Sequence, residues 1–312
     1  MTVAAIERDH KQMTTVSIRN IGEVIMTERL VIDALGTEKI IGTEKSAEVL
    51  RLEAQVKSYE QLLGKIKEGY PSGKIHDHQE FFGGQSLLFG VVSDTHLGST
   101  EERLPDLDTA YKIFEKEGVK QVYHVGDLVA GGRVYRGQEN ELKVWGLDKQ
   151  VQYLTDQYPR VKGLTTYFIT GNHDLSFLKE AGADIGLVIE QKRNDLVYLD
   201  QIEGDVKLAE EIIMRLWHGG GGGAYAKSYK MQRYIASLEG GHKPKILLSG
   251  HYHVDFYMME RNIHSLQVGA FERQTLWLKR TGLSPSFSAW LVNCKIKDGS
   301  INRFCPELLK FF

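Results

Sequence analysis

The sequence predicts an α/β protein in which strands and helices alternate around parallel sheets and further strands follow near the C-terminus. From residue 86 onward, short apolar runs alternate with segments that have the apolar spacing of helices. Five of those apolar runs lead directly into polar residues of the types that bind metals. The last part of the chain changes to consecutive β-rich runs. This order favours a layered α/β sandwich of two sheets, with a helical extension before it.

Residues 1–80 form the expected helical N-terminal extension, and residues 81–312 form the expected main domain. Thr43 could cap a helix over 43–68. Within it, apolar residues recur at alternating spacings of three and four, at Val49, Leu52, Val56, Tyr59, Leu63 and Ile66. Such a helix could pack on the main domain or self-associate as a coiled coil, which would give a homo-oligomer. A winged-helix-like DNA-binding segment over residues 10–45 receives little support from the sequence.

The main domain has a predicted order of elements. Strands are expected at 87–92, 122–125, 166–170, 196–199, 212–217 and 246–249, and again at 254–259, 263–268 and 288–296. Helices are expected from Asp106, over 139–157, and through Met231 and Ile235. Asp298 and Gly299 have the composition of a hairpin turn.

Seven potential metal ligands follow five of these strands: Asp94 and His96, Asp127, Asn172, His218, and His251 with His253. The carboxyl ends of parallel strands meet at one edge of a sheet, so we expect these side chains to converge. Each motif alone could be an ordinary turn or helix cap. Together, seven ligands suit two ions that share a bridge, because one ion uses about four to six. Asp127 stands alone on its strand end and is the natural bridge.

The expected cofactors are therefore two divalent metal ions. Nitrogen and oxygen donors without a cysteine favour Mn²⁺, with Fe or Zn²⁺ as alternatives. A net charge of −2 gives no overall basic field, so any nucleic-acid site must be a local patch. The two cysteines fit a reducing compartment. The N-terminus does not have the pattern of a signal peptide, and no apolar run approaches the ~18 residues of a membrane span. We expect a cytoplasmic protein that does not enter the membrane.

The ligand motifs resemble those of the calcineurin-like metallophosphoesterase superfamily over residues 86–296. The matching motifs are Asp94-x-His96, Gly126-Asp127, Gly171-Asn172-His173-Asp174, His218 and Gly250-His251-x-His253. The resemblance implies a four-layer αββα sandwich. It also implies that Asp94, His96 and His253 hold one ion, that Asn172, His218 and His251 hold the other, and that Asp127 bridges them. His173 would then donate a proton to the leaving group, and Asp174 would orient His173.

Two differences from the motifs of protein phosphatases make that subfamily a poor match. Protein phosphatases of the superfamily carry an arginine after the bridging aspartate and a glutamate after Asn-His, whereas this chain has Leu128 and Asp174. Segments 126–139 and 218–229 look similar to the small subunit of archaeal D-family DNA polymerases and to DNA-repair nucleases. Ala130 stands where that branch often has aspartate.

This resemblance implies a metal-dependent phosphodiesterase or nuclease that hydrolyses DNA through attack by a metal-bridged hydroxide. A stretch of cations over 227–280 could track a nucleic-acid backbone, and the aromatic residues interleaved with it could stack on bases. The cations are Lys227, Lys230, Arg233, Lys243, Lys245, Arg261, Arg273, Lys279 and Arg280. The aromatic residues are Tyr225, Tyr229, Tyr234, Tyr252, Tyr257 and Trp277. One alternative is a small-molecule or nucleotide phosphodiesterase or phosphatase. Another is an accessory subunit of a DNA replication or repair complex, with a partner protein from that assembly.

Overall fold

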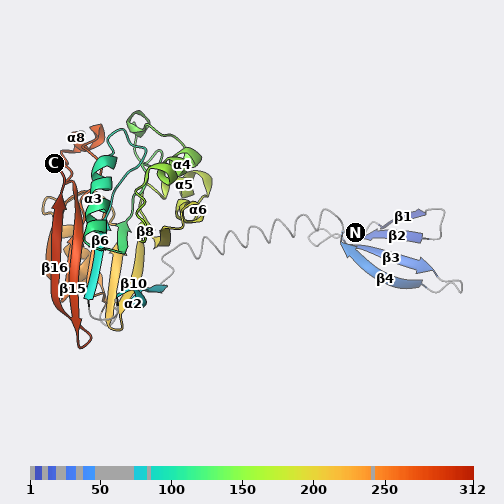
Figure 1. The fold of residues 1–312 in the computed structure, drawn as a ribbon. Coiled ribbons are helices and arrows are strands. Elements are labelled where there is room, and N and C mark those ends of the chain that lie inside the picture. The colour runs from blue at the N-terminus through green and yellow to red at the C-terminus, as the bar shows by residue number, and fades with distance from the viewer. Residues whose placement is uncertain are drawn as a thin grey trace. The chain divides into compact units, whose positions relative to one another are not determined.

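The structure is a computed structural model that describes residues 4–8, 13–18, 26–32, 38–45, 74–82, 86–239 and 243–312. The chain divides into two compact units, Met1–Glu68 and Gly69–Phe312 (Figure 1). In the first unit, four antiparallel strands form one sheet in sequential order. They are β1 (Ala4–Arg8), β2 (Met13–Ile18), β3 (Met26–Ile32) and β4 (Glu38–Lys45).

The prediction that residues 1–80 are helical is wrong for the described strands β1 to β4, and within this segment the structure describes a helix only from Gln79. The β2 sequence, Met-Thr-Thr-Val-Ser-Ile, is rich in β-branched residues, which favour extended backbone. The strands also replace the winged-helix-like segment. Thr43 lies inside β4 and caps no helix there. The remainder of the helix expected over 43–68, beyond Lys45, lies outside the described residues.

One six-stranded sheet of the second unit has the order β16-β15-β6-β7-β8-β9. Strands β6 to β9 are parallel, and β15 and β16 add to β6 as an antiparallel hairpin. Asp298 and Gly299 both have positive φ, so the predicted hairpin turn is confirmed. The strands are β6 (Ser86–Val92), β7 (Gln121–Val125), β8 (Thr165–Thr170), β9 (Leu196–Gln201), β15 (Ser288–Lys297) and β16 (Ser300–Lys310).

The other six-stranded sheet has the order β13-β14-β12-β11-β10-β5. Strands β11, β12 and β14 are parallel, β10 runs antiparallel to β11 and parallel to β5, and β13 runs antiparallel to β14. Strand β5 pairs with β10, so this unit begins before the boundary expected at residue 80. The strands are β5 (Ile75–Asp77), β10 (Glu203–Ala209), β11 (Ile212–Trp217), β12 (Ile246–Ser249), β13 (Phe256–Glu260) and β14 (Ile263–Gln267).

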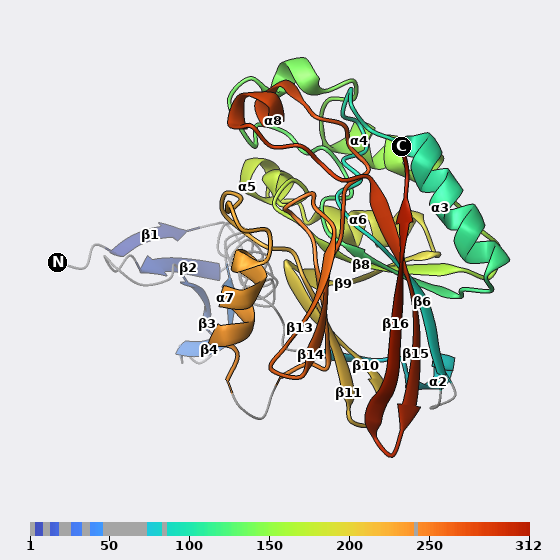
Figure 2. The ribbon, with the colours of Figure 1, turned by 90° about the vertical axis from the view of Figure 1, so that its left-hand side faces the viewer.

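The two sheets pack face to face, and helices cover both outer faces (Figure 2). Phe89 and Tyr123 from one sheet and Met214 and Leu248 from the other share the buried core between them. One outer face is covered by α3 (Leu104–Lys116), α4 (Leu147–Gln157), α5 (Ser176–Ala181) and α6 (Ile185–Lys192), and the other by α7 (Tyr229–Ser237). The predicted αββα sandwich is confirmed.

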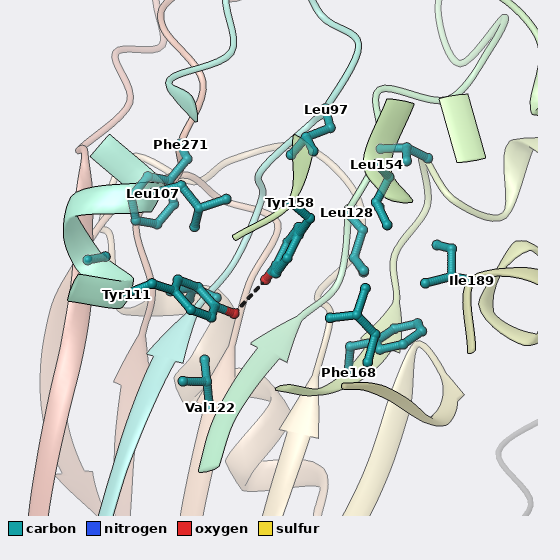
Figure 3. Close-up of a cluster of buried hydrophobic side chains, with 14 of the residues drawn as sticks. Leu97, Leu107, Tyr111, Val122, Leu128, Leu154, Tyr158, Phe168, Ile189 and Phe271 are labelled. Carbon is teal, nitrogen blue, oxygen red and sulfur yellow. Dashed lines mark hydrogen bonds between the residues drawn. The ribbon is translucent and has the colours of Figure 1, made fainter. Parts of the chain in front are cut away.

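A cluster of buried side chains holds the first helices on their sheet (Figure 3). Leu107 and Tyr111 of α3 pack with Val122 of β7 and Phe168 of β8. The Tyr111 hydroxyl lies 2.8 Å from the Tyr158 hydroxyl, so this buried polar group has a partner. The packing fixes the strands whose carboxyl ends carry the expected ligands.

Shorter elements connect these layers. The helix expected over 139–157 is divided into the 3₁₀ turn η1 (Gln138–Glu141) and α4, because Gly146 adopts positive φ between them. Helix α2 (Gln79–Phe82) follows β5, and α8 (Leu276–Thr281) follows β14. Sequence reasoning predicted neither α8 nor the strands β10 and β16.

Candidate metal centre

The structure brings all seven predicted ligands together at the carboxyl edge of the sheets. They follow β6 (Asp94, His96), β7 (Asp127), β8 (Asn172), β11 (His218) and β12 (His251, His253). Donor atoms of Asp94, His96 and His253 lie within 4.8 Å of one another, and so do those of Asp127, His218 and His251. Asn172 Oδ1 lies 3.2 Å from His218 Nε2. The structure thus brings together each of the two sets of side chains that the resemblance implied, and their role as ligands stays a prediction.

Asp127 lies between the two groups. Its Oδ2 is 3.2 Å from Nε2 of His218 and 3.8 Å from Nε2 of His96. A third group of close donors contains His96, Asp127 and His173. The carboxylate of Asp127 can therefore contact an ion in either group.

The backbone at the ligand positions is turned into the left-handed region. Positive φ values occur at Asp94 (51°), His96 (42°), Asp127 (56°), His251 (77°) and His253 (55°). Such angles are costly for residues with a side chain and concentrate at functional sites. Hydrogen bonds between neighbouring loops hold the turned backbone, since Asp94 N donates to Gly126 O at 3.0 Å.

A glycine precedes three of the ligands because the loops pass very close to one another. A Cβ on Gly126 would collide with the His218 ring, and one on Gly171 would collide with the Asp127 carboxylate. A Cβ on Gly250 would collide with the Ser93 hydroxyl. The glycines therefore allow ligands from separate strands to reach one centre.

Hydrogen bonds behind the ligands set which imidazole nitrogen faces the centre. His218 Nδ1 donates to Val125 O at 2.7 Å, which leaves Nε2 towards Asp127. His251 Nε2 donates a hydrogen bond to Gly221 O at 2.9 Å, which leaves the lone pair of Nδ1 free to bind a metal ion. Such outer contacts orient metal-binding histidines. The glycine run thus supplies a carbonyl that positions a ligand.

The donor set fits divalent cations. The Nε2 atoms of His96 and His253 face each other at 3.1 Å, and His253 Nε2 is 3.2 Å from Asp94 Oδ1. Ser93 donates to Asp94 Oδ2 at 2.6 Å, which holds this carboxylate in place. Imidazole nitrogens and carboxylate oxygens aimed at one point are the donors that Mn²⁺, Fe and Zn²⁺ accept.

Charge in the buried centre also favours a cation. Burial alone would lower the pKa of His96, but Glu272, Asp94 and Asp127 raise that pKa to about 10. Burial alone would raise the pKa of Asp127, but His218 and His173 hold it far below its usual range. The pKa of Asp94 is lowered in the same way, through His253 and His96. Asp94 and Asp127 thus stay ionised, and their negative charge attracts a cation.

His173 and Asp174 have different partners from those expected. His173 Nδ1 donates to Ala130 O at 2.7 Å, which leaves Nε2 able to exchange a proton. Asp174 accepts hydrogen bonds from the backbone of Leu128 (3.1 Å), Val129 (3.0 Å) and Gly171 (2.9 Å). The expectation that Asp174 orients His173 directly is wrong, because Ala130 holds the ring. Asp174 instead joins the Asp127 loop to the Asn172 loop.

A cavity of about 550 Å³ opens over the centre, and Glu272, which was not predicted as a site residue, forms part of its lining. Glu272 Oε2 lies 4.0 Å from His96 Nε2, and Glu272 is buried. Tyr135 and Trp277 line another part of the cavity. Glu272 follows the apolar run Val-Gly-Ala-Phe after β14. A polar residue directly after an apolar run is the pattern that identified the predicted ligands, but here the run lies beyond the end of the strand.

Comparison with protein families decides the classification. The family model described as calcineurin-like phosphoesterase matches residues 87–255. The chain belongs to this family. Members are metal-dependent phosphoester hydrolases, and the clustered ligands of this chain agree with that chemistry. A comparison with curated proteins found no match.

The solved structures to which this chain is similar are distant in sequence. A novel archaeal phosphodiesterase is 15% identical, with 72% of this chain and 100% of that chain covered and a TM-score of 0.40. GAP50, the anchor in the inner membrane complex of Plasmodium, is 12% identical, with 73% and 90% covered and a TM-score of 0.42. Vacuolar Protein Sorting 29 from Cryptosporidium parvum is 15% identical, with 73% and 100% covered and a TM-score of 0.34. Likenesses at this level carry no argument about substrate.

Within the part of the chain that the structure describes, no helix is both long and apolar enough to cross a membrane.

Proposed function

We propose that this phosphoesterase hydrolyses phosphodiester bonds of nucleic acid with two divalent ions. The observation that carries the proposal is the position of Asp127, whose carboxylate lies between two separate groups of ligands. One shared carboxylate is the arrangement that two neighbouring ions need. Nitrogen and oxygen donors support Mn²⁺ as the ion.

Different residues of the chain have different roles in the proposed hydrolysis. Ions bound at the seven ligands would activate water and neutralise charge on the phosphate. His173 is held by its Nδ1 on Ala130, so its Nε2 can give a proton to the departing oxygen. Asp174 keeps the loops of Asp127 and Asn172 in register.

Charge in the cavity supports a diester as the substrate. Glu272 adds a third buried carboxylate beside Asp94 and Asp127. A phosphomonoester brings a second negative charge that this carboxylate repels, whereas a diester carries one. The phosphate-binding arginine expected of protein phosphatases is also replaced by Leu128.

Exposed cations near the cavity support a polymeric substrate. Arg133 and Lys179 line the cavity, and Lys279 and Arg280 lie exposed on α8, whose Trp277 is part of the wall. Basic side chains beside a phosphodiesterase site can contact flanking phosphates. Arg261 does not belong to such a surface, because it donates to the carbonyls of Ile235, Ala236 and Leu238.

A second candidate is a phosphodiesterase for small nucleotides. The observation that favours it is the limited volume of the cavity, about 550 Å³, which lies in the range of small-ligand sites. A purely structural role as an accessory subunit is disfavoured, because every predicted ligand is present at the centre.

The proposal is tested by digestion of end-labelled single- and double-stranded DNA with Mn²⁺, beside bis(p-nitrophenyl) phosphate. Asp127→Asn is the blank, and Asp148→Asn, at an exposed position of α4, is the matched control. We expect the wild type and the control to shorten DNA, and Asp127→Asn to lose both activity and bound metal. Cleavage of the small diester with DNA left intact would favour the small-nucleotide candidate.

A further inference from the structure

Two aromatic side chains form one wall of the cavity beside the proton donor. The rings of Tyr135 and Trp277 stack at 5.4 Å with an interplanar angle of 29°. The Tyr135 ring is also 6.3 Å from the ring of His173. All three residues line the cavity. The aromatic wall, which is Tyr135 with Trp277, therefore lies on the side where the leaving group receives its proton.

A buried carboxylate holds this wall together. Glu141 of η1 accepts a hydrogen bond from the Tyr135 hydroxyl with one oxygen, and from the backbone N of Trp277 at 3.1 Å with the other. Thr275 caps α8 by accepting from Leu278 N at 3.2 Å. Two segments distant in sequence are thus fixed to one another, and both rings are set before any substrate arrives.

Trp277 keeps 39% of its surface exposed, although it lines a cavity. Its backbone is tied to Glu141, and one side of its ring is covered by Tyr135. A large aromatic side chain that remains open in a cavity is a common anchor for a flat ligand. Every nucleobase offers such a face, so stacking does not depend on base identity.

We propose that the aromatic wall stacks on the nucleobase of the leaving nucleoside and thereby selects nucleotide diesters over other phosphodiesters. This inference rests on the proposed function, and it adds which side of the scissile phosphate is recognised. The leaving oxygen must be near His173 to take a proton, and Tyr135 is the aromatic neighbour of that ring. The base attached through that oxygen meets the wall.

Three dinucleotide substrates test the inference with the metal-loaded full chain. They are thymidylyl-thymidine and its two analogues in which one thymidine or the other is replaced by an abasic tetrahydrofuran residue. The product that retains the phosphate identifies the leaving side. We expect wild type to lose about 5- to 100-fold in kcat/KM when the leaving residue is abasic, which is the range of base–aromatic stacking. Loss of the other base should have little effect.

Variants of Trp277 then assign this preference to the wall. Trp277→Ala should cleave thymidylyl-thymidine as slowly as the wild type cleaves the analogue with an abasic leaving residue. On that analogue, the kcat/KM of Trp277→Ala should equal that of the wild type. Trp277→Phe should restore most of the preference. Trp145→Ala is the matched control, because Trp145 is 45% exposed and lies outside the cavity. Metal content is measured for each variant, so that damage to the centre is recognised.

Four outcomes would overturn the inference. An equal loss of kcat/KM by Trp277→Ala on all three substrates would show that the aromatic wall stabilises the structure and does not bind the base. A loss that follows the retained base would place the wall on the other side of the phosphate. Equal cleavage of all three substrates by wild type would reject base recognition while leaving the proposed function intact. Cleavage of bis(p-nitrophenyl) phosphate with no dinucleotide cleaved would reject the proposed function, and the inference with it.

Discussion

At the scale of single residues, His173 lies beside the predicted ligands, but one nitrogen of its ring is bonded to the backbone. Its backbone N donates to Asp127 Oδ1 at 2.8 Å, and its ring is held by the carbonyl of Ala130. One nitrogen of the ring is therefore occupied by a partner that is not a metal ligand. This arrangement suits a proton donor held at a fixed place beside the centre.

We therefore predict that His173→Ala keeps its bound metal but loses about 10²- to 10⁴-fold in turnover on diesters with alkoxide leaving groups. The loss should be much smaller for p-nitrophenol, which leaves without a proton. Metal analysis and kinetics with both substrates measure this, and His264→Ala, a histidine outside the cavity, is the control. A fall in metal content together with activity would instead make His173 a ligand.

Two ligand histidines give the protein a predicted dependence on pH. Carboxylates overcome the effect of burial and raise the pKa of His96 to about 10 and that of His218, chiefly through Asp127, to about 9. The metal-free protein therefore has this stabilisation in full below about pH 6.5 and loses it as the pH rises through 9 to 10. Metal binding needs both rings neutral, so metal affinity should rise over the same range.

Titration of the metal-free protein with Mn²⁺ at pH 6.5 and pH 8.5 measures this effect. We expect affinity to increase by about tenfold per pH unit for each proton that the ion displaces. Thermal unfolding should agree: the difference in Tm between the metal-loaded and the metal-free protein should increase from pH 6.5 to pH 8.5. An affinity that stays constant over this interval would show that neither ring holds a proton before metal binds.

At the scale of elements, the strand-end loops were the most predictable feature of the sequence. Each parallel strand could be recognised from its apolar run, and parallel strands must end at one edge, so Asp94, Asp127 and Asn172 were expected to meet. Glu272 was not predicted as a site residue, because it lies in a loop that is placed by packing. Trp277 was expected only as one of several aromatic residues on a nucleic-acid surface, because its short helix could not be placed beside the centre from the sequence. The role of Asp174 was misjudged, because adjacency in sequence does not show which way a side chain points.

The glycines in these loops give a prediction at this scale. Gly171→Ala places a methyl group against the Asp127 carboxylate, so we expect metal affinity to fall by about 10- to 100-fold, as for other disturbances behind metal ligands. Gly222→Ala is the matched control, because a Cβ there meets nothing within 4 Å. Equal metal binding by both variants would contradict the close approach of the loops.

At the scale of the whole molecule, the chain contains two units of different architecture. All seven ligands, His173 and the two six-stranded sheets belong to residues 69–312. The four-stranded sheet of the first unit was not predicted, because the apolar spacing over 43–68 is typical of a helix and the β-branched residues of β2 and β3 were the only sign of strands. The sandwich of two sheets was predictable because strands alternate with helices and consecutive strands then follow, and the resemblance to the superfamily added the four-layer αββα order.

We predict that a chain of residues 69–312 retains the metal content and the diester activity of the full protein, because the centre and its supporting layers are contained in it. Metal analysis and hydrolysis of bis(p-nitrophenyl) phosphate measure this, with Asp127→Asn in the short chain as the blank. The masses of both chains in solution test the self-association expected through 43–68. Loss of metal from the short chain would show that the first unit supports the centre.

The left-handed backbone at five ligand positions has a consequence for amide hydrogen exchange. Each such residue costs about 1 kcal/mol or more, and bound ions offset this cost by holding the side chains in place. Chelation should therefore let the loops open locally while the sheets stay closed. The amides of Asp94 and His96, which bond to Gly126 and Asp127, would exchange faster with deuterium after chelation, whereas those within β7 and β8 would keep their protection.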